Sequence, residues 1–128
     1  LFNHGNYAGI DISKRYIEYA KKKYRKNFEV MNAASLKFID SSFNNILIFG
    51  LIHHLSDQDV WAVLCEAKRV LDSQGKMLVI EDIPTLFYFN IFGKIMHYFD
   101  RGKYIRSLQQ YNNLLAHYFF VINYFLNT

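Results

Sequence analysis

The strongest constraint on the fold is an alternation between short apolar runs and segments with helical spacing. Four short runs predict β-strands, namely residues 7–10, 28–31, 46–49 and 76–81. Helical spacing follows Ser13 and again follows Ser56 or Asp57, and each of these residues is a suitable N-cap. The order strand, helix, strand, strand, helix, strand is typical of a parallel sheet, because parallel strands need crossover connections. The sequence therefore predicts an α/β fold.

Two of these segments carry more detailed predictions. The run Ile46–Phe49 is continuously apolar and is closed by Gly50, which predicts a strand buried on both faces. The second helix should bury one face and should stop at Ser73–Gly75. That face holds Val60, Leu64, Ala67 and Leu71. On the same helix we expect Cys65 to be a buried, inert thiol.

The last third of the chain is rich in aromatic residues and has weaker patterns. It predicts a helix around Phe89–Phe99, a second helix at Gln109–Ala116 and a final strand at Phe119–Phe125. Asp100–Gly102 should separate the two helices.

Length and composition exclude several classes of protein. A chain of 128 residues suggests one domain, and its single Cys excludes an internal disulfide or an all-cysteine zinc site. The longest apolar stretch, residues 114–126, is shorter than the roughly 20 residues that a membrane span needs. The first residues do not have the pattern of a signal peptide. We therefore expect a soluble cytoplasmic protein that has no membrane partner.

The net charge of +4 comes from one segment. Residues 14–26 hold seven of the fifteen basic groups and one acid, which leaves eight basic and ten acidic groups elsewhere. A solvated helix face, with cations near the negative end of the helix dipole, explains this pattern best. The alternative is a phosphate-binding patch, because Tyr16, Tyr19 and Tyr24 lie among the cations. Nucleic-acid binding is therefore not expected from the overall charge.

Candidate site residues follow from the fold, since ligands of parallel α/β sheets bind beyond the carboxyl ends of the strands. These ends carry Asp11, Asn32–Ala33, Phe49–Gly50 and Glu81–Asp82. Asp11 could accept hydrogen bonds from both hydroxyls of a ribose, or it could simply support the start of the next helix. Glu81–Asp82 could line a pocket for a second substrate or only end a strand. These alternatives stay open on the residues alone.

Four motifs together resemble the class I S-adenosylmethionine-dependent methyltransferases of the small-molecule type. They are GIDIS (9–13), VMNAASLKF (30–38), SFNNILIFGLIHHLSD (42–57) and RVLDSQGKMLVIED (69–82). Their order and spacing match the family over residues 6–82. The resemblance implies a Rossmann-like, mostly parallel sheet with helices on both faces. It also implies S-adenosylmethionine as the cofactor and a small-molecule methyl acceptor.

The resemblance assigns roles to individual residues near the cofactor. Asp11 matches the acid that holds the ribose, and Ile12 matches the apolar neighbour of the adenine. Asn32 stands where the family usually has an Asp near the adenine amino group, and it keeps an acceptor oxygen without the charge. Ala33 matches the residue whose backbone N–H reaches the adenine ring.

On the methionine side, Phe49 and Gly50 match the strand end whose backbone faces that part of the cofactor. His53 and His54 are candidate general bases for the methyl acceptor. Alternatively they are structural, one packed under the following helix and the other capping it or facing solvent. No spacing of His, Cys and carboxylates predicts a metal site.

One departure from the family shapes the functional prediction. The family's Gly-rich loop lies about twenty residues before the ribose acid, whereas ten residues precede Asp11 here. We therefore expect residues 1–128 to form a single, N-terminally incomplete methyltransferase domain. Residues 6–82 would be its cofactor side, and residues 83–128 a substrate lid with a final helix and strand.

The predicted function is methyl transfer from S-adenosylmethionine to a small molecule, as part of a longer enzyme. Two alternatives stay open. One is an inactive, truncated domain that serves as a binding module. The other is an RNA-binding or RNA-modifying protein that uses the basic segment 14–26.

Overall fold

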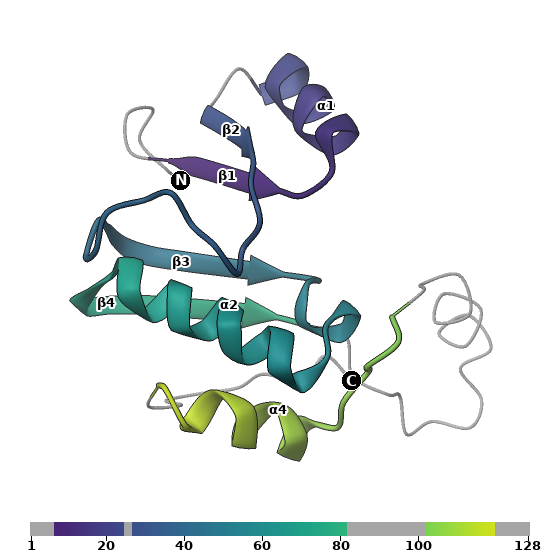
Figure 1. Ribbon diagram of the computed structural model, residues 1–128, viewed down its shortest axis with the longest axis vertical. Helices are drawn as coiled ribbons and strands as arrows, with labels where there is room; N and C mark the ends of the chain where they lie inside the picture. Colours follow the sequence, from purple (N-terminus) through teal and green to yellow (C-terminus); the bar gives the residue numbers. More distant parts are fainter. Residues whose placement is uncertain (1–6, 25–26, 82–101, 120–128) are drawn as a thin grey trace.

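The computed structural model describes residues 7–24, 27–81 and 102–119 (Figure 1). In chain order the elements are β1 (Ala8–Asp11), α1 (Lys14–Tyr24), β2 (Asn27–Val30), β3 (Phe43–Phe49), the 3₁₀ helix η1 (Ile52–His54), α2 (Asp57–Val70), β4 (Leu71–Ile80) and α4 (Leu108–Ala116). The helix predicted at Phe89–Phe99 and nearly all of the strand predicted at Phe119–Phe125 lie outside the described residues.

All four described strands are parallel to their partners, which confirms the α/β prediction. β1 pairs with β2, and Asp11 lies opposite Val30. β3 pairs with β4, and Phe49 lies opposite Ile80. The two pairs are hydrogen-bonded as separate two-stranded sheets. Within the described part of the chain, the expected sheet therefore consists of two parallel pairs.

Local sequence signals set the helix starts. The Ser13 hydroxyl accepts a hydrogen bond from the Tyr16 N–H, at 3.4 Å, at the start of α1. The Ser56 hydroxyl accepts one from the Asp59 N–H, at 3.2 Å, at the start of α2. Both serines act as the sequence predicted, because a side-chain oxygen satisfies an N–H that has no partner inside the first turn. Ser107 begins α4 with a capping box completed by Gln110.

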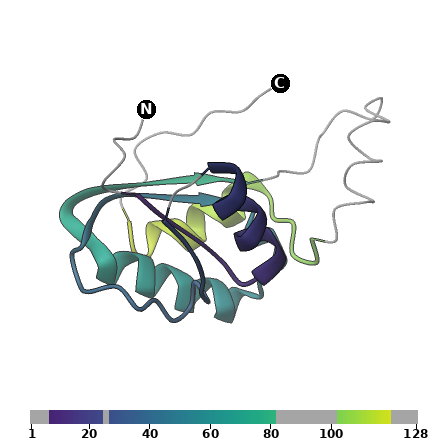
Figure 2. The ribbon, with the colours of Figure 1, turned by 90° about the horizontal axis from the view of Figure 1, so that it is seen from above.

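The hydrophobic core lies between α2, α4 and one face of the β3–β4 pair. Figure 2 shows α2 and α4 on the same side of these strands. The predicted face of α2 is buried, and Val60 and Leu64 are inaccessible to solvent. They pack with Ile48, Ile52 and Tyr111. The 3.6-residue period therefore identified the correct face of α2.

The expectation that Ile46–Phe49 is buried on both faces is wrong. Ile48 is buried, but Leu47 is 55% exposed and Phe49 is 72% exposed. The reason is that α2 and α4 cover one face of this pair, and no described residues cover the other face. Leu78 and Ile80 of β4 are exposed as well. An apolar run thus identified the strand but not the number of its covered faces.

Two predictions on α2 and its continuation also need correction. Cys65 is exposed, because it lies on the outward side of α2 while its neighbour Leu64 enters the core. Its thiol donates a hydrogen bond to the Tyr118 hydroxyl at 3.1 Å.

The prediction that α2 stops at Ser73–Gly75 is also wrong, because α2 ends at Val70 and β4 already begins at Leu71. These residues lie in an irregular part of β4, where the register changes between Leu71 and Lys76.

A charged pair on α2 anchors the connection between β2 and β3. Glu66 accepts the N–H of Leu36 at 2.7 Å, and Arg69 donates to the carbonyl oxygens of Leu36 and Phe38. Arg69 also bonds both Glu66 oxygens and Asp40. The Arg69 guanidinium, followed by the Leu36 N–H, lowers the pKa of Glu66 to about 2. This contact holds the loop against the outer side of α2.

Candidate functional site

The first group of predicted site residues lies at the carboxyl ends of β1 and β2. Asp11 is the last residue of β1 and is half-buried. Its Oδ1 accepts the Ser13 N–H at 2.6 Å, and its carbonyl oxygen accepts the Met31 N–H at 3.0 Å. The carboxylate is therefore fixed where the chain leaves the strand. Within the described residues, Oδ1 of Asp11 accepts the Ser13 N–H, and Oδ2 is available to accept a hydrogen bond from a ligand.

Asn32 and Ala33 follow β2 in a tight turn beside Asp11. The Oδ1 of Asn32 accepts the Ala34 N–H at 2.9 Å, and its carbonyl oxygen accepts the Ser35 N–H at 3.0 Å. Because Asp11 lies opposite Val30, the turn is at the same edge of this sheet as the Asp11 carboxylate. The Asn32 oxygen supports the turn, which leaves its NH₂ as the group best placed to donate to a ligand. Ile12 is 76% exposed at this edge.

The second group lies at the carboxyl ends of β3 and β4. Phe49 ends β3, and Gly50 turns the chain with a φ of +57°. The Gly50 N–H donates to the Ile80 carbonyl oxygen at 2.9 Å. A Cβ on Gly50 would lie 3.7 Å from His53 Cε1, an ordinary contact, so the left-handed backbone is what favours glycine here.

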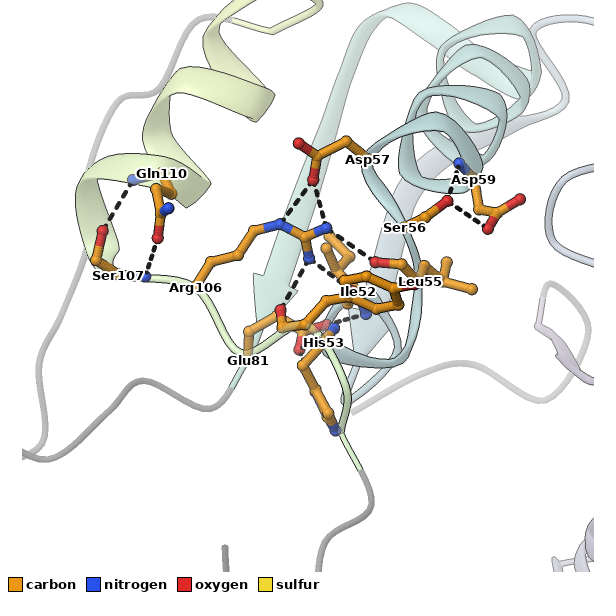
Figure 3. A network of polar contacts seen from close by, with 11 residues as sticks. Ile52, His53, Leu55, Ser56, Asp57, Asp59, Glu81, Arg106, Ser107 and Gln110 are labelled. Carbon is orange, nitrogen blue, oxygen red and sulfur yellow. Dashed lines mark hydrogen bonds and ion pairs between the residues drawn. The ribbon is translucent and has the colours of Figure 1, made fainter.

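Glu81 organises this second group from the end of β4. Its Oε1 accepts the N–H groups of Leu51 at 2.9 Å and Ile52 at 2.7 Å. Its Oε2 lies 2.6 Å from Nδ1 of His53, and both side chains are 5% exposed (Figure 3). A carboxylate can only accept, so Nδ1 of His53 donates this hydrogen bond. Glu81 therefore closes the start of η1 and orients the imidazole.

The two histidines have different environments. His53 is buried and held by Glu81, as in the structural alternative. His54 is exposed, and its ring centroid lies 4.0 Å from that of His53. Of the two candidate bases, His54 is therefore the one that an external acceptor could reach directly.

Arg106 is the most important residue that sequence reasoning missed. It is 6% exposed, and it donates to the carbonyl oxygens of Ile52, Tyr104 and Leu55 at 3.0, 3.0 and 2.8 Å. Its Nε also donates to Asp57 at 3.0 Å (Figure 3). The Tyr104 N–H donates to the His53 carbonyl oxygen at 2.9 Å. Together these bonds fasten the segment before α4 to η1.

No local signal in the sequence distinguishes Arg106 from an ordinary surface arginine. Its partners lie about fifty residues earlier in the chain. The nearest usable signal was the Ser107–Gln110 spacing, which marks the start of α4 but not the function of the preceding residue.

The structure thus brings the predicted residues together in two groups, one for each strand pair. Asp11, Ile12, Asn32 and Ala33 lie at the end of β1–β2, and Phe49, Gly50 and His53 lie at the end of β3–β4 with Glu81. In Figure 1 the arrowheads of β1, β3 and β4 are at the same side of the molecule. No group of three His, Cys, Asp or Glu residues suited to a metal ion occurs in the described part of the chain.

Comparison with known proteins decides the family. A model described as a methyltransferase domain matches residues 1–79, more than half of the chain. The chain belongs to the class I S-adenosylmethionine-dependent methyltransferases. In this methyltransferase domain, Asp11 and Phe49 are the last residues of parallel strands. None of its described helices is long and apolar enough to cross a membrane.

Curated relatives of this methyltransferase domain include two enzymes named demethylmenaquinone methyltransferase. The one from Thermotoga maritima is 33% identical over 82 residues, which are 63% of this chain and 35% of that enzyme. The one from Tropheryma whipplei (strain Twist) is 31% identical over 77 residues, 58% of this chain and 31% of that enzyme. The chain thus spans about a third of the length of these relatives.

Solved structures support the same fold. The PH0226 protein from Pyrococcus horikoshii OT3 aligns with a TM-score of 0.52 and 32% identity, over 56% of this chain and 36% of that one. The YcgJ protein from Bacillus subtilis aligns with a TM-score of 0.64 and 24% identity, over 86% of this chain and 50% of that one. The second likeness concerns the fold alone.

Proposed function

We propose that this chain binds S-adenosylmethionine at the carboxyl ends of its strands and serves methyl transfer to a small-molecule acceptor. The observation that carries the proposal is the position of Asp11, fixed at the end of β1 beside the Asn32 turn. An acid and an amide at one edge of a parallel pair suit the hydroxyls of a ribose and the polar edge of a base.

The residues present suit such a cofactor. Asp11 supplies a carboxylate oxygen for the ribose hydroxyls, and the exposed Ile12 supplies an apolar surface for the adenine. Asn32 and the backbone N–H of Ala33 supply polar groups for the ring edge. Bound S-adenosylmethionine would provide an electrophilic methyl group on a sulfonium. The contribution of the chain is to bind and orient it, since in-line positioning supplies much of the rate of such a reaction.

The acceptor would approach the β3–β4 side of the site. The relatives are named for a menaquinone precursor, which supports a small organic acceptor for this chain too. Exposed Phe49 offers an aromatic surface, and exposed His54 offers a base for an acceptor hydroxyl. His53 is buried within η1 and bonded to Glu81, so we assign it a structural role on this side of the site.

Calorimetric titration with S-adenosylhomocysteine tests the cofactor proposal. We expect the chain to bind, and we expect Asp11→Ala to weaken binding at least about tenfold, because two charge-assisted hydrogen bonds are lost. The matched control is Glu29→Gln, which removes one negative charge from an exposed position on β2. Binding should be unchanged in this control.

Two outcomes would contradict the proposal. If Asp11→Ala binds as tightly as the unmodified chain, the ribose assignment is wrong. If the unmodified chain gives no heat of binding, the cofactor proposal fails for this chain, and a binding module without methyl transfer becomes the better explanation.

A further inference from the structure

Helix α1 presents a continuous basic and aromatic surface that the cofactor site does not use. Its inward side is held by buried Ile17 against β1 and β2. Arg15, Tyr19, Lys22 and Lys23 follow at i, i+4, i+7 and i+8, on the face opposite to Ile17. In Figure 1 this helix stands at one end of the molecule, away from α2 and α4.

The charge on this surface is nearly unopposed within α1. Five of its eleven residues are Lys or Arg, and all five are exposed. Its one acid, Glu18, lies 3.8 Å from Lys14. The remainder of the chain beyond segment 14–26 carries a small excess of acids. The positive potential is therefore concentrated on one face, which is the arrangement that attracts an extended anionic partner.

Three tyrosines lie among these cations and are more than half exposed: Tyr16, Tyr19 and Tyr24. Tyrosine has an apolar ring and a polar tip, and this combination is favoured at the boundary between lipid headgroups and water. Lysines beside such rings can reach the phosphate groups while their stems cover apolar surface.

The ring contacts favour lipid over nucleic acid. The Lys23 ammonium lies 5.4 Å from the ring centre of Tyr19 and 5.2 Å from that of Tyr24. The ammonium occupies one face of each ring, so a base could stack only on the opposite face. A headgroup phosphate needs only the cations, and the ring edges remain available at the interface.

We propose that the outer face of α1, formed by Arg15, Tyr16, Tyr19, Lys22 and Lys23, docks this domain on an anionic lipid surface. The contact is peripheral, since α1 keeps its apolar side against the strands. It departs from the expectation of no membrane partner, which rested on the lack of an apolar stretch long enough to span a membrane. This contact requires no cofactor and no methyl transfer, so it can be tested independently of the proposed function.

Vesicle sedimentation of the full chain tests this proposal. We expect binding to vesicles of phosphatidylglycerol and phosphatidylcholine in equal parts, no binding to phosphatidylcholine alone, and release at high salt. The triple variant Arg15→Gln, Lys22→Gln, Lys23→Gln should bind about 100-fold more weakly, because each cation near an anionic surface contributes about fivefold. Glutamine keeps the helix propensity of the replaced residues.

The matched control removes the same charge from other exposed positions, by Lys37→Gln, Lys76→Gln and Lys103→Gln. It should bind the anionic vesicles nearly as well as the unmodified chain. Equal losses in the two triple variants would show a nonspecific charge effect and overturn the proposal. No binding of the unmodified chain to anionic vesicles would also overturn it. The proposal fails as well if a uridine oligonucleotide displaces the chain from the vesicles at equal phosphate concentration, because RNA would then be the better partner.

Discussion

At the scale of single residues, Glu81 accepts four hydrogen bonds, three from backbone N–H groups and one from the His53 ring. It accepts the N–H groups of Leu51 and Ile52 and holds the Nδ1 of His53 in a buried position. Backbone N–H groups at the start of η1 have no acceptor within the helix, so the Glu81 carboxylate accepts their hydrogen bonds. The residue therefore couples the end of β4 to the turn that follows β3.

We expect Glu81→Ala to lower the free energy of unfolding by about 3 kcal/mol, because three partly buried N–H groups and an imidazole lose their acceptor. Glu81→Gln should cost less, since it keeps one acceptor oxygen. The midpoint of urea unfolding measures both effects. Glu29→Ala, on the exposed side of β2, is the control and should stay within about 0.5 kcal/mol of the unmodified chain. Similar losses for Glu81→Ala and Glu29→Ala would refute the structural role of Glu81.

At the scale of elements, Arg106 joins η1 to the chain that leads into α4. Its guanidinium bonds the carbonyl oxygens of Ile52 and Leu55, and its partner Asp57 lies in the first turn of α2. A buried guanidinium is tolerable only when all of its donors have acceptors, and three carbonyls and a carboxylate meet that need here. The packing of α4 beside α2 therefore depends on a polar contact as well as on apolar surface.

We expect Arg106→Met to destabilise the fold by about 2–4 kcal/mol, because the carbonyl oxygens of Ile52, Tyr104 and Leu55 lose a buried donor and Asp57 loses its ion pair. Arg106→Lys should be intermediate, since an ammonium cannot reproduce the planar set of five donors. Hydrogen exchange of the Tyr104 amide should accelerate in both variants. Protection of that amide in Arg106→Met as strong as in the unmodified chain would show that other contacts hold this segment.

At the scale of the whole molecule, one apolar layer and one charged anchor connect elements from distant parts of the chain. The layer lies between the β3–β4 pair and helices α2 and α4, while Leu47, Phe49 and Leu78 on the other face are exposed. The anchor is Glu66 with Arg69, which holds the connection from β2 to β3 against α2. It is therefore one of the contacts that bind the first half of the domain to the second.

The lowered pKa of Glu66 predicts how stability changes with acid. Its value of about 2 in the folded chain lies below the ordinary 4.5, so its contribution is fully present above about pH 4.5. That contribution is lost progressively as the pH falls towards about 2. Urea midpoints measured between these two pH values should fall more steeply for the unmodified chain than for Glu66→Gln. The control Glu18→Gln, at an exposed position, should retain the steeper slope. Equal slopes for Glu66→Gln and the unmodified chain would contradict this assignment.

Much of the fold, and the position of the candidate site residues at the strand ends, could be predicted from the sequence. Residue periods identified the strands and the buried face of α2, and Ser13 and Ser56 identified the helix starts. The strand ends directed attention to Asp11, Asn32 and Gly50, because a parallel sheet presents these ends at one edge. These signals are local, because each depends only on residues a few positions apart in the chain.

Only the tertiary structure decided the rest. It showed that Cys65 and Phe49 are exposed, because burial depends on which element covers a face and not on the apolar character of the residue itself. It also joined Glu81 to His53 and Arg106 to Ile52, across 28 and 54 residues of chain. The sequence by itself determined that strands and helices alternate in this order, and it determined where α1 and α2 begin. The tertiary structure decided which buried polar groups meet, because each needs a partner that folding brings from a distant part of the chain.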